Sequence, residues 1–257
     1  KEVVEQHALV FGTPLAPPDW ALGGAWVDAI RGVERLQTVA EELREAKASV
    51  SAIWTEDWKG GEDYDFGYHL SPEWEVDQEK YPDAAGIAQD LESRGYAWLA
   101  YFSPFIAKDS KAGTEASEMV IRTADGDPYW FIGMTFKPTS VLDLTREDAR
   151  QWAVTKMQAA LSLGFDGWML DFAEWLPPDA VLRGADALDN HNSYPLWWQS
   201  TNQEATAGAD VVTFSRSGWS GTSTTSAVTW AGDQRTSFDS DDGLPTVIPM
   251  GLGLGIG

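Results

Sequence analysis

Short apolar runs alternate with segments of helical periodicity from residue 25 onward, and this alternation restricts the possible folds more than any other feature of the sequence. The apolar runs predict strands at 25–27, 49–54, 97–102, 167–170, 211–215 and 227–231. Helical spacing predicts helices at 33–43, 84–93, 146–163 and 196–207, and a closing helix at 243–254 with an N-cap from 240–242. Such alternation is typical of a parallel sheet covered by helices.

Six βα units fit either an open doubly wound sheet or a (β/α)8 barrel. The open sheet would be favoured by a Gly-x-Gly-x-x-Gly turn after the first strand, which is absent, and the glycine-rich run 251–255 lacks a preceding strand. We therefore expect an α/β fold of the (β/α)8 TIM-barrel type over residues 25–257, after a Pro- and Gly-rich lead-in segment at 1–24. A barrel needs eight strands, so we expect this one to be truncated after about six units and completed by a missing C-terminal part or another chain.

The acidic composition narrows the range of partners. The 257 residues include 40 Asp plus Glu against 18 Lys plus Arg, for a formal net charge of -22. This charge repels phosphate backbones and anionic lipids, so neither nucleic acid nor a membrane is expected as a partner. Cysteine is absent and the three histidines are widely spaced, so we expect no metal site built from these residues. The 14 tryptophans, together with the carboxylates, are typical of a sugar-binding cleft.

Two aspartates stand where predicted strands end. Asp171 follows the run 167–170, and Asp233 follows the sixth run. The carboxyl ends of parallel strands form the ligand side of the sheet. Two carboxylates in unequal environments supply the nucleophile and the proton donor of glycoside hydrolysis. The alternative is that each aspartate simply caps a turn.

Four motifs resemble glycoside hydrolase family 31, most of all its sulfoquinovosidase branch. The run 164–177 (GFDGWMLDFAEWLP) resembles the nucleophile strand, and 214–218 (FSRSG) resembles the strand that follows it. The run 230–234 (WAGDQ) resembles the acid/base segment, and 54–58 (WTEDW) falls where that branch has its early substrate loop. The likeness covers nearly the whole chain, with three of the motifs in the family's order and spacing.

The resemblance implies a retaining, exo-acting α-glycosidase that acts on an α-linked carbohydrate without a cofactor. It implies that Asp171 is the nucleophile and Asp233 the general acid/base. It also places three residues in the sugar site: Trp168, Arg216 and Trp230. Glu174 either orients the nucleophile loop, binds a sugar hydroxyl or forms a plain salt bridge.

The sequence departs from the sulfoquinovosidase pattern at the residues that grip the sulfonate. The branch has an Arg and a Trp after Phe-Gly, whereas residues 68–72 here read YHLSP, and its Gln is replaced by Glu56. A carboxylate ~4 Å from a sulfonate would repel it by about 4 kcal/mol at an intermediate effective dielectric. We therefore expect a neutral sugar, or an amino sugar, whose hydroxyls bind Glu56 and Asp57, with His69 as a further lining residue. The alternatives are a non-catalytic or truncated carbohydrate-binding barrel and a sulfoquinovosidase.

Overall fold

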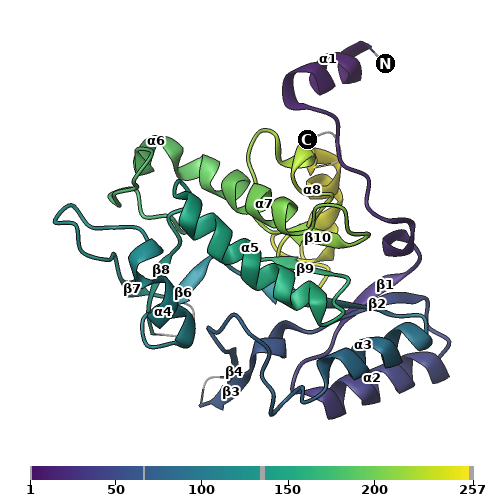
Figure 1. The fold of residues 1–257 in the computed structure, drawn as a ribbon. Coiled ribbons are helices and arrows are strands. Elements are labelled where there is room, and N and C mark those ends of the chain that lie inside the picture. The colour runs from purple at the N-terminus through teal and green to yellow at the C-terminus, as the bar shows by residue number, and fades with distance from the viewer. Residues whose placement is uncertain (1, 66, 134–136, 255–257) are drawn as a thin grey trace.

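The computed structural model describes residues 2–65, 67–133 and 137–254. Its main sheet has six strands in which every neighbouring pair is parallel. In spatial order these are β1 (Ala25–Asp28), β2 (Val50–Trp54), β5 (Ala97–Phe102), β9 (Gly167–Leu170), β10 (Val212–Ser215) and β11 (Val228–Thr229). The helices between them are α2 (Val33–Glu45), α3 (Ala84–Ser93), α5 (Glu147–Ser162) and α7 (Tyr194–Ala205), and α5 lies beside α7 (Figure 1). The predicted parallel α/β architecture is confirmed.

The sheet is strongly curled, as in a barrel. Neighbouring strands lie about 4.8 Å apart, so β1 and β10, four positions apart, would be separated by roughly 19 Å in a flat sheet. Yet the rings of Trp26 on β1 and Phe214 on β10 have centroids only 5.2 Å apart. Trp54 on β2 packs against the same phenylalanine at 5.5 Å. These aromatic side chains fill the concave face that the curl creates.

The central strands are buried on both faces, which explains their continuous apolar sequences. All four residues of β9 and five of the six residues of β5 are buried. A local sequence signal marks the start of helix α3. The Asp83 side chain is its N-cap and accepts a hydrogen bond from the Gly86 N–H at 3.1 Å. The strands at 97–102 and 167–170 and the helix at 84–93 begin and end where the sequence predicts.

Two insertions follow the ends of β2 and β5. The first forms an antiparallel hairpin of β3 (Gly61–Tyr64) and β4 (Gly67–Leu70). The second contains α4 (Lys111–Ala116) and a three-stranded sheet in the order β6 (Phe105–Ala107), β8 (Pro138–Val141) and β7 (Phe131–Ile132). Both insertions extend from the carboxyl ends of the main strands, the side on which ligands bind in this architecture.

The terminal segments differ from expectation. A helix, α1 (Glu2–Phe11), lies within the lead-in, buries none of its side chains and projects from the body of the molecule (Figure 1). The closing helix α8 (Val247–Leu254) begins later than predicted, so the N-cap from residues 240–242 is wrong. Instead the Asp239 carboxylate accepts the N–H groups of residues 241 and 242, which closes a turn.

A short helix, α6 (Ala187–Asn190), precedes α7. In the described ranges no helix is long and apolar enough to span a membrane.

Candidate active site

A cavity of about 310 Å³ opens at the carboxyl ends of the main strands. Its walls come from β5, from the segments that follow β2, β9, β10 and β11, and from both insertions. The lining residues are Glu56, Lys59, Tyr68, His69, Leu70, Ser71, Pro72, Tyr101, Ser103, Phe105, Thr139, Asp171, Phe172, Arg216 and Asp233. The structure therefore brings together five of the residues singled out in the sequence: Asp171, Asp233, Glu56, His69 and Arg216.

Asp171 is held directly after β9 by two hydrogen bonds and one ion pair. Its Oδ2 accepts the Tyr101 hydroxyl at 2.6 Å, and its Oδ1 accepts the Phe172 N–H at 3.0 Å. The Arg216 Nη1 lies 3.6 Å from the same Oδ1. Burial raises the pKa of the Asp171 carboxyl above its usual value, while the two hydrogen bonds and the positive charge of Arg216 act in the opposite direction. The carboxylate is fixed in orientation and shielded from bulk water.

The backbone after Asp171 is strained. Phe172 has a φ of 60° and Ala173 a φ of 84°, in the left-handed region that non-glycine residues rarely occupy. The Ser217 hydroxyl donates to the Phe172 carbonyl and supports this turn. Strain of this kind, held by surrounding contacts, is common at functional sites. It turns the chain away from the strand at the position where the carboxylate enters the cavity.

Arg216 links the cavity to Glu174. Its Nε donates to Glu174 Oε1 at 3.0 Å, and its guanidinium stacks over the Phe172 ring at 4.1 Å from the centroid. Of the roles considered for Glu174, the ion pair is the one present. Its Oε2 is buried, and no side chain in the described part of the chain donates to it. The guanidinium thus lies between two carboxylates, Glu174 and Asp171.

Asp233 has a contrasting environment beyond β11. It is exposed at the cavity wall, and no hydrogen bond or ion pair joins it to another of the described residues. Its charge nevertheless acts on other residues of the cavity, because it contributes to raising the pKa values of Glu56 and Arg216. Asp233 therefore faces the cavity without a partner that fixes its orientation.

Glu56 and Lys59 enter the cavity from one 3-10 turn, Glu56–Lys59, that follows β2. The turn is kinked at Asp57, and both the Glu56 and the Lys59 side chain line the cavity. Burial raises the pKa of Glu56 to about 8, with further contributions from Asp28, Asp171 and other carboxylates. The pKa places Glu56 in its neutral, protonated form at pH 7, so the repulsion expected between Glu56 and an anion is absent there.

Lys59 is a lining residue that sequence reasoning missed. It is 4% exposed, and burial lowers the pKa of its ammonium group to about 7. The ammonium lies 5.2 Å from the centroid of the Tyr101 ring and 5.8 Å from that of Phe102. The local sequence, in which Lys59 precedes two glycines, does not mark this lysine as a site residue. Its place in the cavity follows only once it is known that Lys59 and Glu56 belong to the same turn.

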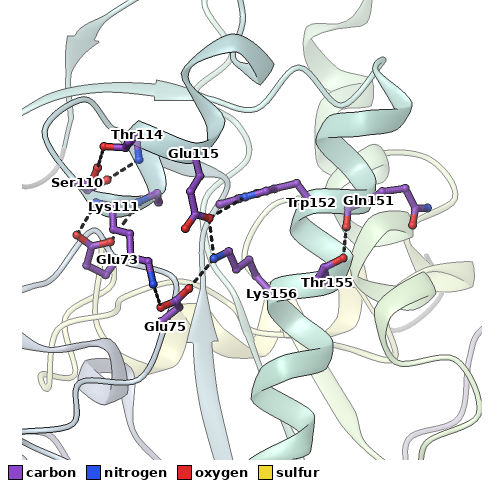
Figure 2. Close-up of polar contacts among 12 residues, drawn as sticks. Glu73, Glu75, Ser110, Lys111, Thr114, Glu115, Gln151, Trp152, Thr155 and Lys156 are labelled. Carbon is purple, nitrogen blue, oxygen red and sulfur yellow. Dashed lines mark hydrogen bonds and ion pairs between the residues drawn. The ribbon is translucent and has the colours of Figure 1, made fainter.

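A polar network anchors the cavity wall formed by the segment after β4 (Figure 2). Glu75 of that segment pairs with Lys111 at the start of α4 and with Lys156 of α5, the latter at 2.6 Å. Lys156 also pairs with Glu115 at 2.7 Å. The Glu73 carboxylate accepts the N–H groups at the start of α4. The wall is therefore fixed to helices on two sides.

Comparison with known proteins identifies the family. A model of the TIM-barrel domain of glycosyl hydrolases family 31 matches residues 14–257. The chain belongs to this family. It is 31% identical over 260 residues to a sulfoquinovosidase of Escherichia coli (strain K12), a match that covers 98% of this chain and 38% of that protein.

Solved family 31 structures share the fold. A sulfoquinovosidase from E. rectale in complex with an aza-sugar inhibitor superposes with a TM-score of 0.91 at 31% identity, over 99% of this chain and 39% of that one. A dextranase of Flavobacterium johnsoniae superposes with a TM-score of 0.86 at 20% identity. The chain spans about two fifths of the length of the sulfoquinovosidases it matches, at 38% and 39%. The TIM-barrel assignment is thereby confirmed.

Besides Glu174, three predicted site residues are not among those that line the cavity of this family 31 domain. Trp168 is fully buried, and its indole N–H donates to Asn202 of α7 at 2.7 Å, so its expected place in the sugar site is wrong. Asp57 is also fully buried, and it accepts the Arg31 N–H and the hydroxyls of two tyrosines, Tyr68 and Tyr81, which leaves no oxygen for a sugar. Trp230 packs against Phe214 on the concave face, at 5.8 Å. No group of three or more His, Asp or Glu in the described ranges is placed to hold a metal ion.

Proposed function

We propose that this domain carries the catalytic site of a retaining, exo-acting α-glycosidase. Asp171 is the nucleophile, and Asp233 is the general acid and base. The observation that supports this best is that two carboxylates in unequal environments line one cavity at the ends of β9 and β11. The first is buried and fixed by two hydrogen bonds and an ion pair, whereas the second is exposed and has no fixed partner. Glycoside hydrolysis uses two such groups in different roles.

The first half of the reaction forms a covalent intermediate. An Oδ of ionised Asp171 attacks the anomeric carbon, and the bond between that carbon and the leaving oxygen breaks. Asp233 donates its proton to the departing oxygen, so the aglycone leaves as a neutral alcohol. Tyr101 and Arg216 hold the attacking carboxylate in place by the contacts described above.

The second half releases the sugar. Asp233, now ionised, takes a proton from a water molecule, and the water oxygen attacks the anomeric carbon. The ester bond to Asp171 breaks, and its electron pair returns to the carboxylate. Two inversions at the same carbon give a product with the α configuration of the substrate. The cavity of about 310 Å³ lies at the lower end of the range for small-molecule sites and suits one terminal sugar rather than an open-ended chain.

Two other functions are supported by specific observations. The relative named sulfoquinovosidase at 31% identity supports that activity, and the neutral form of Glu56 removes the charge objection to it. A non-catalytic carbohydrate-binding barrel is supported by the lack of any hydrogen bond that positions Asp233 among the described residues.

The experiment is to follow hydrolysis of aryl α-glycosides by the intact protein with ¹H NMR. We expect the α-anomer of the free sugar to appear first and then to mutarotate. Mass spectrometry of a trapped intermediate should place the glycosyl ester on the peptide that contains Asp171. Asp210→Asn, at an exposed carboxylate before β10, serves as the matched control and should keep the activity. First release of the β-anomer would rule out the retaining mechanism, and sugar binding without turnover would favour the non-catalytic barrel.

A further inference from the structure

The hairpin of β3 and β4 forms one wall of the cavity, to which it contributes Tyr68, His69 and Leu70. A hairpin of two strands has little stability of its own, so its position depends on contacts with the rest of the protein. One such contact is made by Tyr68, whose hydroxyl donates to the fully buried Asp57 carboxylate at 2.5 Å. Gly61, on the opposite strand, leaves room for this contact, because a Cβ there would lie 2.5 Å from the Tyr68 hydroxyl oxygen.

Arg31, in the loop after β1, makes a second attachment. Its guanidinium donates two hydrogen bonds to the Asp63 carboxylate, at 2.8 and 2.9 Å, and lies over the Tyr68 ring at 4.6 Å from the centroid. Asp63 and Tyr68 are opposite each other in the hairpin, so one arginine contacts both strands. The Arg31 N–H also donates to Asp57, at 2.8 Å. Arg31 therefore joins the hairpin to the same buried carboxylate that accepts the Tyr68 hydroxyl.

The backbone conformation of Arg31 is unfavourable for an arginine. Its φ is 87°, in the left-handed region that glycine and asparagine occupy more readily. The ion pair with Asp63 is exposed, with 53% and 65% of the two side chains accessible, and such pairs contribute little to the stability of a whole protein. Global stability therefore does not explain an arginine at this position, whereas a local role in holding the hairpin does.

Resting on the proposed function, we propose that Arg31 is a positioning residue for the sugar site. It holds the β3–β4 hairpin against the body of the protein and thereby sets the place of the Tyr68 ring in the cavity wall. Arg31 is not among the residues that line the cavity, so it acts on the substrate through the hairpin. A wall that must be ordered when the sugar binds lowers affinity. Asp171 and Asp233 belong to other segments, so KM should change more than kcat.

The test measures kcat and KM of the intact protein with 4-nitrophenyl α-glycosides (glucoside, xyloside and sulfoquinovoside), using whichever substrate it hydrolyses fastest. Arg31→Asn suits the left-handed backbone and keeps the N–H, but removes the guanidinium. We expect KM to rise about five- to tenfold, kcat to change less than about twofold and the melting temperature to stay within about 3 °C. Lys47→Asn is the matched control: Lys47 is an exposed cation with a φ of 51° before β2, and both constants should stay unchanged.

Two further variants disturb the same wall by different means. Asp63→Asn removes the partner of Arg31, so its KM should rise by no more than that of Arg31→Asn. The double variant should show no further rise, because both changes remove one ion pair. Gly61→Ala displaces the Tyr68 hydroxyl without changing any charge, and should also raise KM. Additive effects of the Arg31 and Asp63 changes would mean that Arg31 does not act through the hairpin.

A measurement by hydrogen exchange does not depend on turnover. The hairpin amides should exchange about tenfold faster in Arg31→Asn, and those of β5 and β9 at the wild-type rate. Unchanged exchange of the hairpin, a lower kcat at unchanged KM, or a large fall in melting temperature would refute the positioning role while the α-glycosidase proposal stands. Absence of any turnover would instead refute the proposed function, and hydrogen exchange would still decide whether Arg31 holds the hairpin.

Discussion

The two candidate catalytic carboxylates follow strands of one sheet, but their surroundings differ. Asp171 directly follows β9, which lies in the middle of the sheet between β5 and β10. Its carboxylate contacts Tyr101 on β5 and Arg216, which follows β10. Asp233 follows β11, a two-residue strand at the edge of the described sheet, and is exposed. The centre of the sheet fixes a carboxylate, whereas its edge leaves one free.

This difference matches what the two proposed roles require. A nucleophile must be held within a short distance and a narrow angle of the anomeric carbon, so fixed donors and a buried site favour the reaction. A general acid and base must gain and lose a proton in each cycle, and fixed donors to its charged form would oppose protonation. The strained turn at Phe172 and Ala173 lies beside the first group.

The largest expected effect is at the fixed carboxylate. Asp171→Asn keeps the shape of the side chain but removes its negative charge, so kcat/KM should fall by roughly 10⁴-fold or more for every α-glycoside, whatever its leaving group. Steady-state kinetics on activated and unactivated substrates measure this. Asp166→Asn, at the other end of β9, retains an oxygen to accept the Trp98 N–H and should keep most of the activity. Substantial turnover by Asp171→Asn would assign the nucleophile to another residue.

The second effect depends on the substrate and tests the free carboxylate. Asp233→Ala should lower kcat/KM by roughly 10²–10⁴-fold for alkyl glycosides, the usual contribution of general acid catalysis. For an aryl glycoside with a strongly acidic phenol the loss should be much smaller, because such a group leaves without protonation. Rates plotted against the pKa of the leaving group should be steeper for the variant than for the wild type. Equal slopes would mean that Asp233 donates no proton in this step.

The sequence located Asp171 because a buried parallel strand leaves a clear pattern. A continuous apolar run such as 167–170 defines a strand, and the polar residue after it must lie at the ligand end. Trp168 was wrongly predicted to line the sugar site, although the alternation of side chains along the same strand shows which face it occupies. Successive side chains in a strand alternate between faces, so Trp168 and Asp171, three positions apart, point to opposite sides.

The turn after β2 could be predicted only in part. Glu56 was expected in the cavity and lies there, whereas Asp57 was expected beside it and is buried behind it. The outcome depends on the turn Glu56–Lys59, which is kinked at Asp57 and leaves Glu56 and Lys59, but not Asp57, at the cavity. The sequence carries no signal that distinguishes this turn from an irregular loop. Nor does it show that three donors meet at Asp57, because those donors come from segments distant in the sequence.

A third, smaller effect examines how the central carboxylate is held. Tyr101→Phe removes the hydroxyl that donates to Asp171 Oδ2, and a hydrogen bond to a charged group contributes about 1.5–3 kcal/mol. We expect kcat/KM to fall about 10–100-fold. The lost donor favoured the ionised form, so the pKa of Asp171 should rise and the acid limb of the pH profile should move to higher pH. Tyr96→Phe, a buried tyrosine before β5, is the matched control. An unmoved acid limb would show that Tyr101 does not hold the nucleophile.

The smallest expected effect is a pH-dependent change in stability caused by Glu56. Both Asp171 and Asp233 raise the pKa of this residue, so it can be used to compare them. Its pKa is about 8 in the folded protein against 4.5 for a free side chain. Stability from the protonated form is therefore fully present below about pH 4.5 and is lost as the pH rises through about 8. Glu56→Gln cannot ionise, so its melting temperature should exceed that of the wild type by a margin that grows by several degrees from pH 5 to pH 8.5. Glu62→Gln, an exposed carboxylate on β3, should show no such growth.

The same titration separates the two carboxylates because both raise the pKa of Glu56. Among charged neighbours Asp171 contributes more than Asp233, although burial is the largest cause. Asp171→Asn should therefore lower the Glu56 pKa more than Asp233→Asn does, and the fall in melting temperature with rising pH should level off at a correspondingly lower pH in each variant. Carbonyl infrared spectra of the two variants, with Glu56→Gln as the reference, would measure the pKa directly. A larger shift from Asp233→Asn would mean that the edge carboxylate lies nearer to Glu56 than the central one. The contrast between a fixed carboxylate at the centre of the sheet, Asp171, and a free carboxylate at its edge, Asp233, would then no longer describe the site.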